Sequence, residues 1–116
     1  MNFEKIKDLE YKALQIRKNL LRLCTREVIH IGGDLSIADV MTVLWQYQMK
    51  YNPKNPKDEK RDRFVLSKGH ASAVTSFCQA AIGCFSSEVD IFCFRYIHRL
   101  CIIFMGQFIA EKLVFQ

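Results

Sequence analysis

Helix-breaking residues are scarce at the start of this sequence. Its 116 residues hold only two prolines and five glycines, and neither type occurs before Gly32. A long helix can therefore run without interruption through the N-terminal part. Apolar residues recur there at spacings of three and four, which predicts a helix that buries one face: Leu9, Ala13, Ile16, Leu20 and Leu23.

Long apolar runs are also missing. The longest nearly uncharged run, Leu100–Ala110, is too short for a membrane-spanning helix, which needs about 20 residues. The N-terminus is charged, so it does not resemble a signal peptide. The five cysteines are odd in number and irregularly spaced, which argues against a disulfide framework. These features predict a cytoplasmic protein without a membrane anchor.

Motifs for metal and nucleotide binding are absent or incomplete. There is no pair of cysteines two residues apart, and Cys93, His98 and Cys101 supply too few ligands for a structural zinc site. Neither a P-loop nor a G-x-G-x-x-G pattern occurs. The net charge of +5 can attract anions, but no nucleic-acid recognition motif accompanies it. Nucleic-acid binding by a basic module is therefore an alternative interpretation with little support.

The composition changes near residue 80. Fourteen of the seventeen Lys and Arg precede Phe77, whereas seven of the nine Phe and four of the five Cys lie from Phe77 onward. One domain rarely changes so sharply. We expect one unit over residues 1–85 and an atypical Cys- and Phe-rich tail over 86–116, such as a shifted reading frame would produce.

The middle of the chain predicts a turn followed by a helix. Gly32 and Gly33 mark a turn where the backbone needs a positive φ or a close approach. Ser36 resembles an N-cap, and Asp39 stands three residues later as in a capping box. The apolar stripe of this second helix is predicted from its spacing: Ile37, Val40, Met41 and Leu44. The helix must end before Pro53, because the residue before a proline avoids the helical region.

A loop, a short strand and a third helix are predicted next. Residues 52–63 are polar and contain both prolines. Phe64–Leu66 is typical of a buried strand, and the helical pattern of Ala73–Ile82 ends at Gly83. A strand that leads through a glycine turn into a helix favours the α/β fold class.

Two histidines stand close to these glycines. His30 and His70 are each within two residues of a glycine, in predicted turns beside helices. Loops of this kind display functional residues, and an imidazole can act as acid, base or hydrogen-bond donor near neutral pH. From spacing alone, packing or capping roles remain the alternative.

Three segments together resemble the N-terminal part of transketolases: His30–Val40 (HIGGDLSIADV), Tyr51–Pro56 (YNPKNP) and Arg61–Ser72 (RDRFVLSKGHAS). The resemblance covers residues 5–83. It implies the opening of a thiamine diphosphate-binding α/β domain, mostly helical here, with a parallel-type strand near Phe64–Leu66.

The resemblance also implies an activity and site residues. Transketolases use thiamine diphosphate and Mg²⁺ or another divalent cation to move a two-carbon ketol unit between sugar phosphates. His30 and His70 match histidines of the substrate channel, and His70 also matches a cofactor contact. Gly32, Gly33 and Gly69 would shape the turns.

The metal-binding motif of the family is missing. The resemblance implies a Gly-Asp-Gly sequence for the cation, and this chain has none. We therefore expect no metal ligands in the chain and a truncated, inactive fragment on its own. The alternative is a non-catalytic piece that docks on a separately encoded C-terminal partner chain. We expect a complete relative to be a homodimer.

Overall fold

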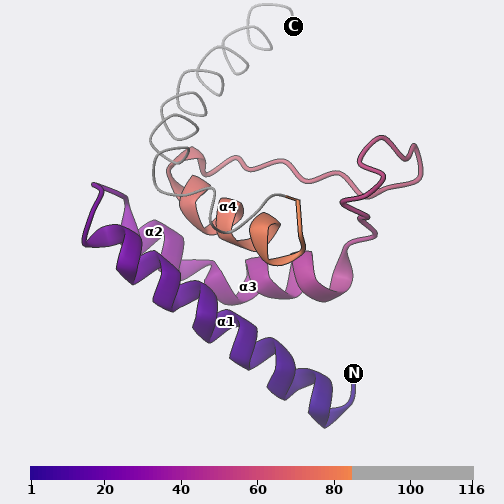
Figure 1. Ribbon diagram of the computed structural model, residues 1–116, viewed down its shortest axis with the longest axis horizontal. Helices are drawn as coiled ribbons and strands as arrows, with labels where there is room; N and C mark the ends of the chain where they lie inside the picture. The colour runs from indigo at the N-terminus through magenta and orange to yellow at the C-terminus, as the bar shows by residue number, and fades with distance from the viewer. Residues whose placement is uncertain (85–116) are drawn as a thin grey trace, which may run out of the picture.

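The chain begins with a helix, α1 (Phe3–Cys24), in the computed structural model, which describes residues 1–84 (Figure 1). The Oδ1 atom of Asn2 caps this helix by accepting a hydrogen bond from the Lys5 N–H at 2.9 Å. The buried residues of α1 are the five that the spacing predicts: Leu9, Ala13, Ile16, Leu20 and Leu23. The first predicted helix and its buried face are therefore confirmed.

A second helical stretch follows in three pieces: α2 (Ile31–Ser36), α3 (Ala38–Val43) and a π-helical turn, η1 (Leu44–Gln48). Ile37, with φ −115° and ψ 6°, separates α2 from α3. The predicted glycine turn is thus wrong, because Gly32 and Gly33 both lie inside α2 and neither has a positive φ. The segment stays helical because glycine also accepts helical dihedrals, at a modest entropic cost.

The predicted cap at Ser36 is wrong as well. No side chain caps α3, and the Ser36 hydroxyl donates to the Gly33 carbonyl at 2.8 Å. Because the chain is already helical before Ser36, that residue ends one helix instead of starting another. Asp39 forms an ion pair with Arg17 of α1.

The buried stripe of this stretch is displaced from the predicted one. Val40 is exposed, and Ile37 and Leu44 are half-buried. Met41 alone keeps its predicted place. The buried side chains lie at helical spacing on a neighbouring face: Asp34, Ala38, Met41, Thr42 and Trp45.

The last described elements are a short 3-10 turn, η2 (Gly69–Ala71), and the helix α4 (Ser72–Ala81). The predicted helix over Ala73–Ile82 is confirmed to within one residue. Gly83 ends it at φ 92°, a dihedral that favours glycine. The N–H of Gly83 donates to the Ala80 carbonyl, and the N–H of Cys84 donates to the Gln79 carbonyl.

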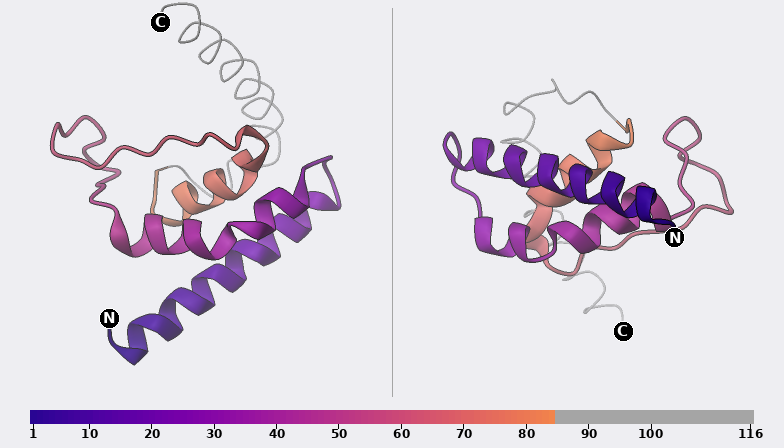
Figure 2. Two further views of the ribbon diagram at one scale, coloured as in Figure 1. Left: turned by 180° about the vertical axis from the view of Figure 1, so that it is seen from behind. Right: turned by 90° about the horizontal axis from the view of Figure 1, so that it is seen from below.

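The helices share one core. Helix α1 lies along α2 and α3, while α4 contacts all three (Figures 1 and 2). Trp45 forms edge-to-face contacts with Tyr51 and Phe64 at centroid distances of 5.7 and 5.4 Å. The core therefore joins all four α-helices to Tyr51 and Phe64, which lie near the two ends of the long connection between η1 and η2.

No strand is formed within residues 1–84. The predicted strand at Phe64–Leu66 has no regular structure, because no neighbouring strand in the described part of the chain pairs with it. Its alternation survives, since Phe64 and Leu66 are half-buried while Val65 is 82% exposed. The α/β class therefore stays a prediction.

The connection between η1 and η2 contains the predicted loop over residues 52–63, which has no helix or strand. Two hydrogen bonds close its base. The Lys50 N–H donates to Asp62 Oδ2 at 2.7 Å, and the Asp62 N–H donates to the Lys50 carbonyl at 2.9 Å.

Several expectations lie outside the described residues. These include the tail over 86–116, the run Leu100–Ala110, and the set Cys93, His98 and Cys101. Within residues 1–84, no helix combines the length and the apolar character needed to cross a bilayer.

Candidate functional site

The two predicted site histidines come together although forty positions separate them. His30 immediately precedes α2, and His70 lies in η2 before α4. Their ring centroids are 5.5 Å apart, with the ring planes at 75°. Both side chains belong to exposed residues. The fold thus presents two adjacent imidazoles at the surface of the described unit.

Gly33 makes this arrangement sterically possible. A Cβ atom at this position would lie 2.6 Å from Cδ2 and 2.8 Å from Nε2 of His70. Real Cβ atoms are essentially never so close to another heavy atom, so His70 must move if Gly33 gains a side chain. At Gly32, by contrast, a Cβ would meet nothing within 4 Å. Only the second glycine of the pair is therefore needed for close approach.

Lys68 lies over the C-terminal part of α2. Its Nζ donates to Ser36 Oγ at 2.8 Å and reaches the Gly33 carbonyl at 3.4 Å. A cation is favoured at the C-terminus of a helix, where carbonyl groups lack intrahelical partners. This side chain thus links the segment before η2 to α2 and brings a positive charge close to Gly33 and the imidazole of His70.

Asp34 connects the two segments that carry the histidines, and the sequence analysis did not identify it. It is fully buried, and its Oδ1 accepts a hydrogen bond from the Val74 N–H at 3.0 Å. Val74 is the third residue of α4, so its N–H has no partner within the helix. The carboxylate therefore caps α4 from a distant part of the chain. The helical spacing of Asp34 with Ala38, Met41 and Trp45 is the signal that could have placed it on the buried face.

The described residues contain no cluster of three or more potential metal-ligating side chains. The three described cysteines are free thiols that differ in burial: Cys24 is exposed, Cys84 is half-buried and Cys78 is buried. Burial raises the pKa of the Cys78 thiol to about 12, and a hydrogen bond with Thr42 acts weakly in the opposite direction. Cys78 is therefore a neutral core residue, not a nucleophile.

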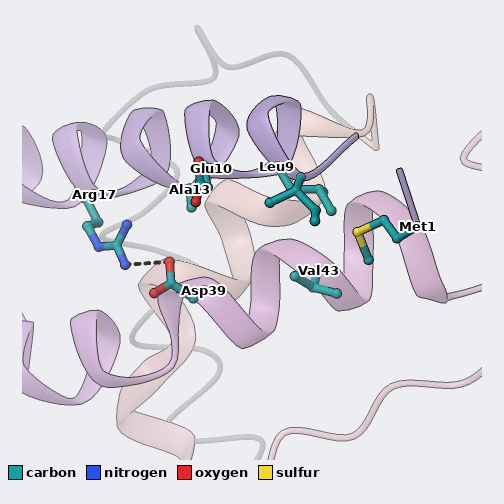
Figure 3. Close-up of a pocket in the computed structure, with 8 residues that line it drawn as sticks. Met1, Leu9, Glu10, Ala13, Arg17, Asp39 and Val43 are labelled. Atoms are coloured by element: carbon teal, nitrogen blue, oxygen red, sulfur yellow. Dashed lines mark hydrogen bonds and ion pairs between the residues drawn. The ribbon is translucent and has the colours of Figure 1, made fainter. Parts of the chain in front are cut away.

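A separate groove of about 460 Å³ lies between α1 and α3 (Figure 3). The ion pair between Arg17 and Asp39 crosses it, as Figure 3 shows. Glu10 and apolar side chains such as Leu9 and Val43 line the remainder. Neither histidine borders this groove, so it does not contribute to the histidine site.

The histidine site is suited to oxygen-rich ligands. Two exposed imidazoles can exchange hydrogen bonds with hydroxyl and carbonyl oxygens, and an imidazole is the commonest general acid or base in enzymes. The Lys68 ammonium adds positive charge beside Gly33, which favours an anionic or strongly polar ligand. The geometry therefore supports acid–base work on a polar small molecule.

The sequence matches a protein family described as "Transketolase, thiamine diphosphate binding domain" over residues 23–102, a range that includes both histidines. Over 85 residues it is 40% identical to a subunit of the apulose-4-phosphate transketolase of Phocaeicola vulgatus. Over 83 residues it is 41% identical to 6-deoxy-6-sulfo-D-fructose transketolase subunit SqwG of a Clostridium species. It is also 38% identical over 69 residues to transketolase 1 of Aliivibrio fischeri.

These matches cover much of this chain but little of the relatives. The first two span 72% and 71% of the chain and 30% of each relative. The third spans 60% of the chain and 10% of the relative. The chain thus corresponds to less than a third of the length of these proteins.

Proposed function

We propose that this chain is part of a ketol-transferring enzyme, because it belongs to the transketolase family. Its residues 23–102 match the thiamine diphosphate binding domain of that family. The reaction is the transfer of a two-carbon ketol unit between sugar phosphates. The observation that carries the proposal is the contact between His30 and His70, with ring centroids 5.5 Å apart.

In this proposal the histidines handle oxygens and protons. One imidazole N–H donates to a sugar hydroxyl, and the other holds or releases a proton at the carbonyl oxygen on which charge develops. Their exposure leaves them accessible to a ligand. Thiamine diphosphate, when bound, supplies the carbon nucleophile and the electron sink.

The described residues fit part of this cofactor requirement. His70 has ring nitrogens that can donate to or accept from a polar group of the cofactor, and Lys68 can complement negative charge nearby. For the divalent cation we look beyond residues 1–84, in which no cluster of three potential ligands occurs.

A complementary subunit is our proposed source of the missing parts. Two relatives are named as subunits of transketolases, which supports an enzyme assembled from separately encoded chains. In this form, the present chain brings the histidine pair and its partner brings the cation site. We propose that this assembly takes place in the cytoplasm. A homodimer of longer chains is the alternative.

Cofactor titration tests the division of labour. We expect calorimetric titration of the full chain with thiamine diphosphate and Mg²⁺ to give no micromolar binding. Binding should appear once the complementary subunit is added. Micromolar binding by the chain alone would contradict the assignment of the cation site to a partner.

A chimaera tests the role of the histidines. Residues 1–84 would replace the matching segment of the Phocaeicola vulgatus relative, which is 40% identical to this chain, and ketol transfer would be measured with that protein's natural partner. We expect His30→Ala and His70→Ala each to lower kcat/KM by about 100-fold or more, the usual worth of acid–base catalysis. Leu21→Ala, on the exposed side of α1, is the control. Full activity in the histidine variants would overturn the proposal.

A further inference from the structure

The N-terminus of α4 obtains its cap from another element. The residue before the helix, Ala71, has no polar side chain and makes no cap bond. The first-turn N–H of Val74 instead donates to Asp34 Oδ1 at 3.0 Å. Negative charge is favoured at this end of a helix, because the unpaired N–H groups carry partial positive charge. The bond thus ties α2 to α4 across forty residues.

The position of this bond relative to the histidines is regular. Asp34 lies four residues after His30, and Val74 lies four residues after His70. The bond therefore joins two segments at the same sequence separation from the two histidines. Fixing Asp34 to Val74 therefore fixes the register in which the rings meet at 5.5 Å.

The Asp34 bond is better protected than the two hydrogen bonds that Lys68 makes with α2, of which the one to the Gly33 carbonyl is long and only part-buried. The bond from Lys68 to Ser36 is exposed, so water competes for both groups. Asp34 is fully buried, and its bond to Val74 is buried too. In a low-dielectric interior such a bond is stronger, and losing it leaves an N–H without a partner. Asp34 is thus the link expected to control the geometry.

We propose that Asp34 is a positioning residue for the histidine pair. By capping α4, Asp34 holds His70 beside His30. It does not touch the ligand. The catalytic consequence rests on the proposed function, but the positioning itself can be measured without turnover. Gly33 permits the approach of His70, whereas Asp34 enforces it.

The test is an NMR measurement on the full chain with isotope-labelled histidine. The chain has three histidines, so their ring signals can be assigned by substitution. We expect a nuclear Overhauser effect between the His30 and His70 rings in the unaltered chain. In Asp34→Ala this signal should be lost, and the Val74 amide should exchange faster with solvent. Asp34→Asn keeps an oxygen acceptor and should retain both properties.

The matched control is Cys78→Ala. Cys78 is fully buried in α4, so its truncation loosens packing without touching the bond between Asp34 and Val74. We expect this variant to lose stability and to keep the signal between the rings. A merely structural role for Asp34 predicts equal loss in both variants, and that result would overturn the proposal.

Three further results would also count against it. They are an unchanged ring signal in folded Asp34→Ala, a lost signal in folded Asp34→Asn, and an unprotected Val74 amide in the unaltered chain. If Asp34→Ala fails to fold, the last two measurements decide. Failure of the transferase proposal is distinguishable, because it appears as full activity in the histidine chimaeras while these NMR results stand.

Discussion

Gly32 and Gly33 are neighbours in α2 with opposite surroundings. A side chain at Gly33 meets the ring of His70, whereas one at Gly32 meets open space. Both backbones are helical, so alanine is acceptable to the backbone at either position. The pair therefore separates the effect of helix propensity from the effect of crowding the site.

We expect Gly32→Ala to stabilise the chain by about 0.5–1 kcal/mol, the advantage of alanine over glycine within a helix. Gly33→Ala gains the same propensity but displaces the exposed His70 ring, so its net effect on stability should be within about 1 kcal/mol of zero. Urea denaturation measures the stabilities. NMR should show that only Gly33→Ala separates the two rings; an intact ring contact in that variant would contradict the described geometry.

Cys78 gives a prediction about pH. Its pKa is about 12 in the folded chain, above the ordinary value of 9.0, because burial disfavours the thiolate. The folded state therefore binds the proton more tightly than the unfolded state does. The resulting stabilisation is complete below pH 9 and is lost as the pH rises toward 12. Unfolding midpoints above pH 9 should fall more steeply for the unaltered chain than for Cys78→Ala.

The control for this measurement is Cys24→Ala, because Cys24 is exposed. This variant retains the Cys78 thiol, so its unfolding midpoint should still fall steeply above pH 9. Equal slopes for the unaltered chain and Cys78→Ala would show that the thiol of Cys78 does not make this contribution.

At the scale of the element, α1 has a buried and an exposed face, and two adjacent leucines lie on opposite faces. Leu20 is fully buried against the core, and Leu21 is 54% exposed. Truncating a buried leucine removes apolar contacts and leaves a cavity. Leu20→Ala should therefore lower the free energy of unfolding by about 2–5 kcal/mol, and Leu21→Ala should change it by less than about 0.5 kcal/mol. Urea denaturation decides, and similar losses in both variants would contradict this orientation of α1.

The elements differ in how far the sequence could predict them. The α1 face is apolar throughout, so periodicity alone identified all five buried residues. The helix α4 is bounded by a glycine, which made its end predictable. The face of α2 and α3 carries the polar residues Asp34 and Thr42, whose partners are the Val74 N–H and the Ala38 carbonyl. Apolar spacing could not detect a face whose polar groups are satisfied by tertiary and local hydrogen bonds.

The same distinction applies to the candidate site. Glycines and the family resemblance marked both histidines; the fold brings their rings together, while their role stays a prediction. For Asp34, helical spacing could indicate burial, but its role as a cap becomes clear only when the distant helix α4 is known. Strand formation at Phe64–Leu66 likewise depends on a neighbour, and residues 1–84 supply none.

At the scale of the molecule, the core that the helices of residues 1–84 share predicts cooperative unfolding of this part. Trp45 is the only tryptophan and contacts aromatic residues from both ends of the long connection. Its fluorescence should therefore change together with the loss of helical circular dichroism, at one urea concentration. Two separate midpoints would show that the connection opens independently of the helices.

The hydrogen bonds between Lys50 and Asp62 close residues 51–61 into a loop with a fixed base. Doubling the length of a closed flexible loop costs only about 0.6 kcal/mol. A fluorophore, an affinity peptide or a small reporter protein could thus be grafted after Lys57, at the exposed tip. The molecule carries a handle by which its assembly could be followed while the histidine pair and the helical core are left untouched.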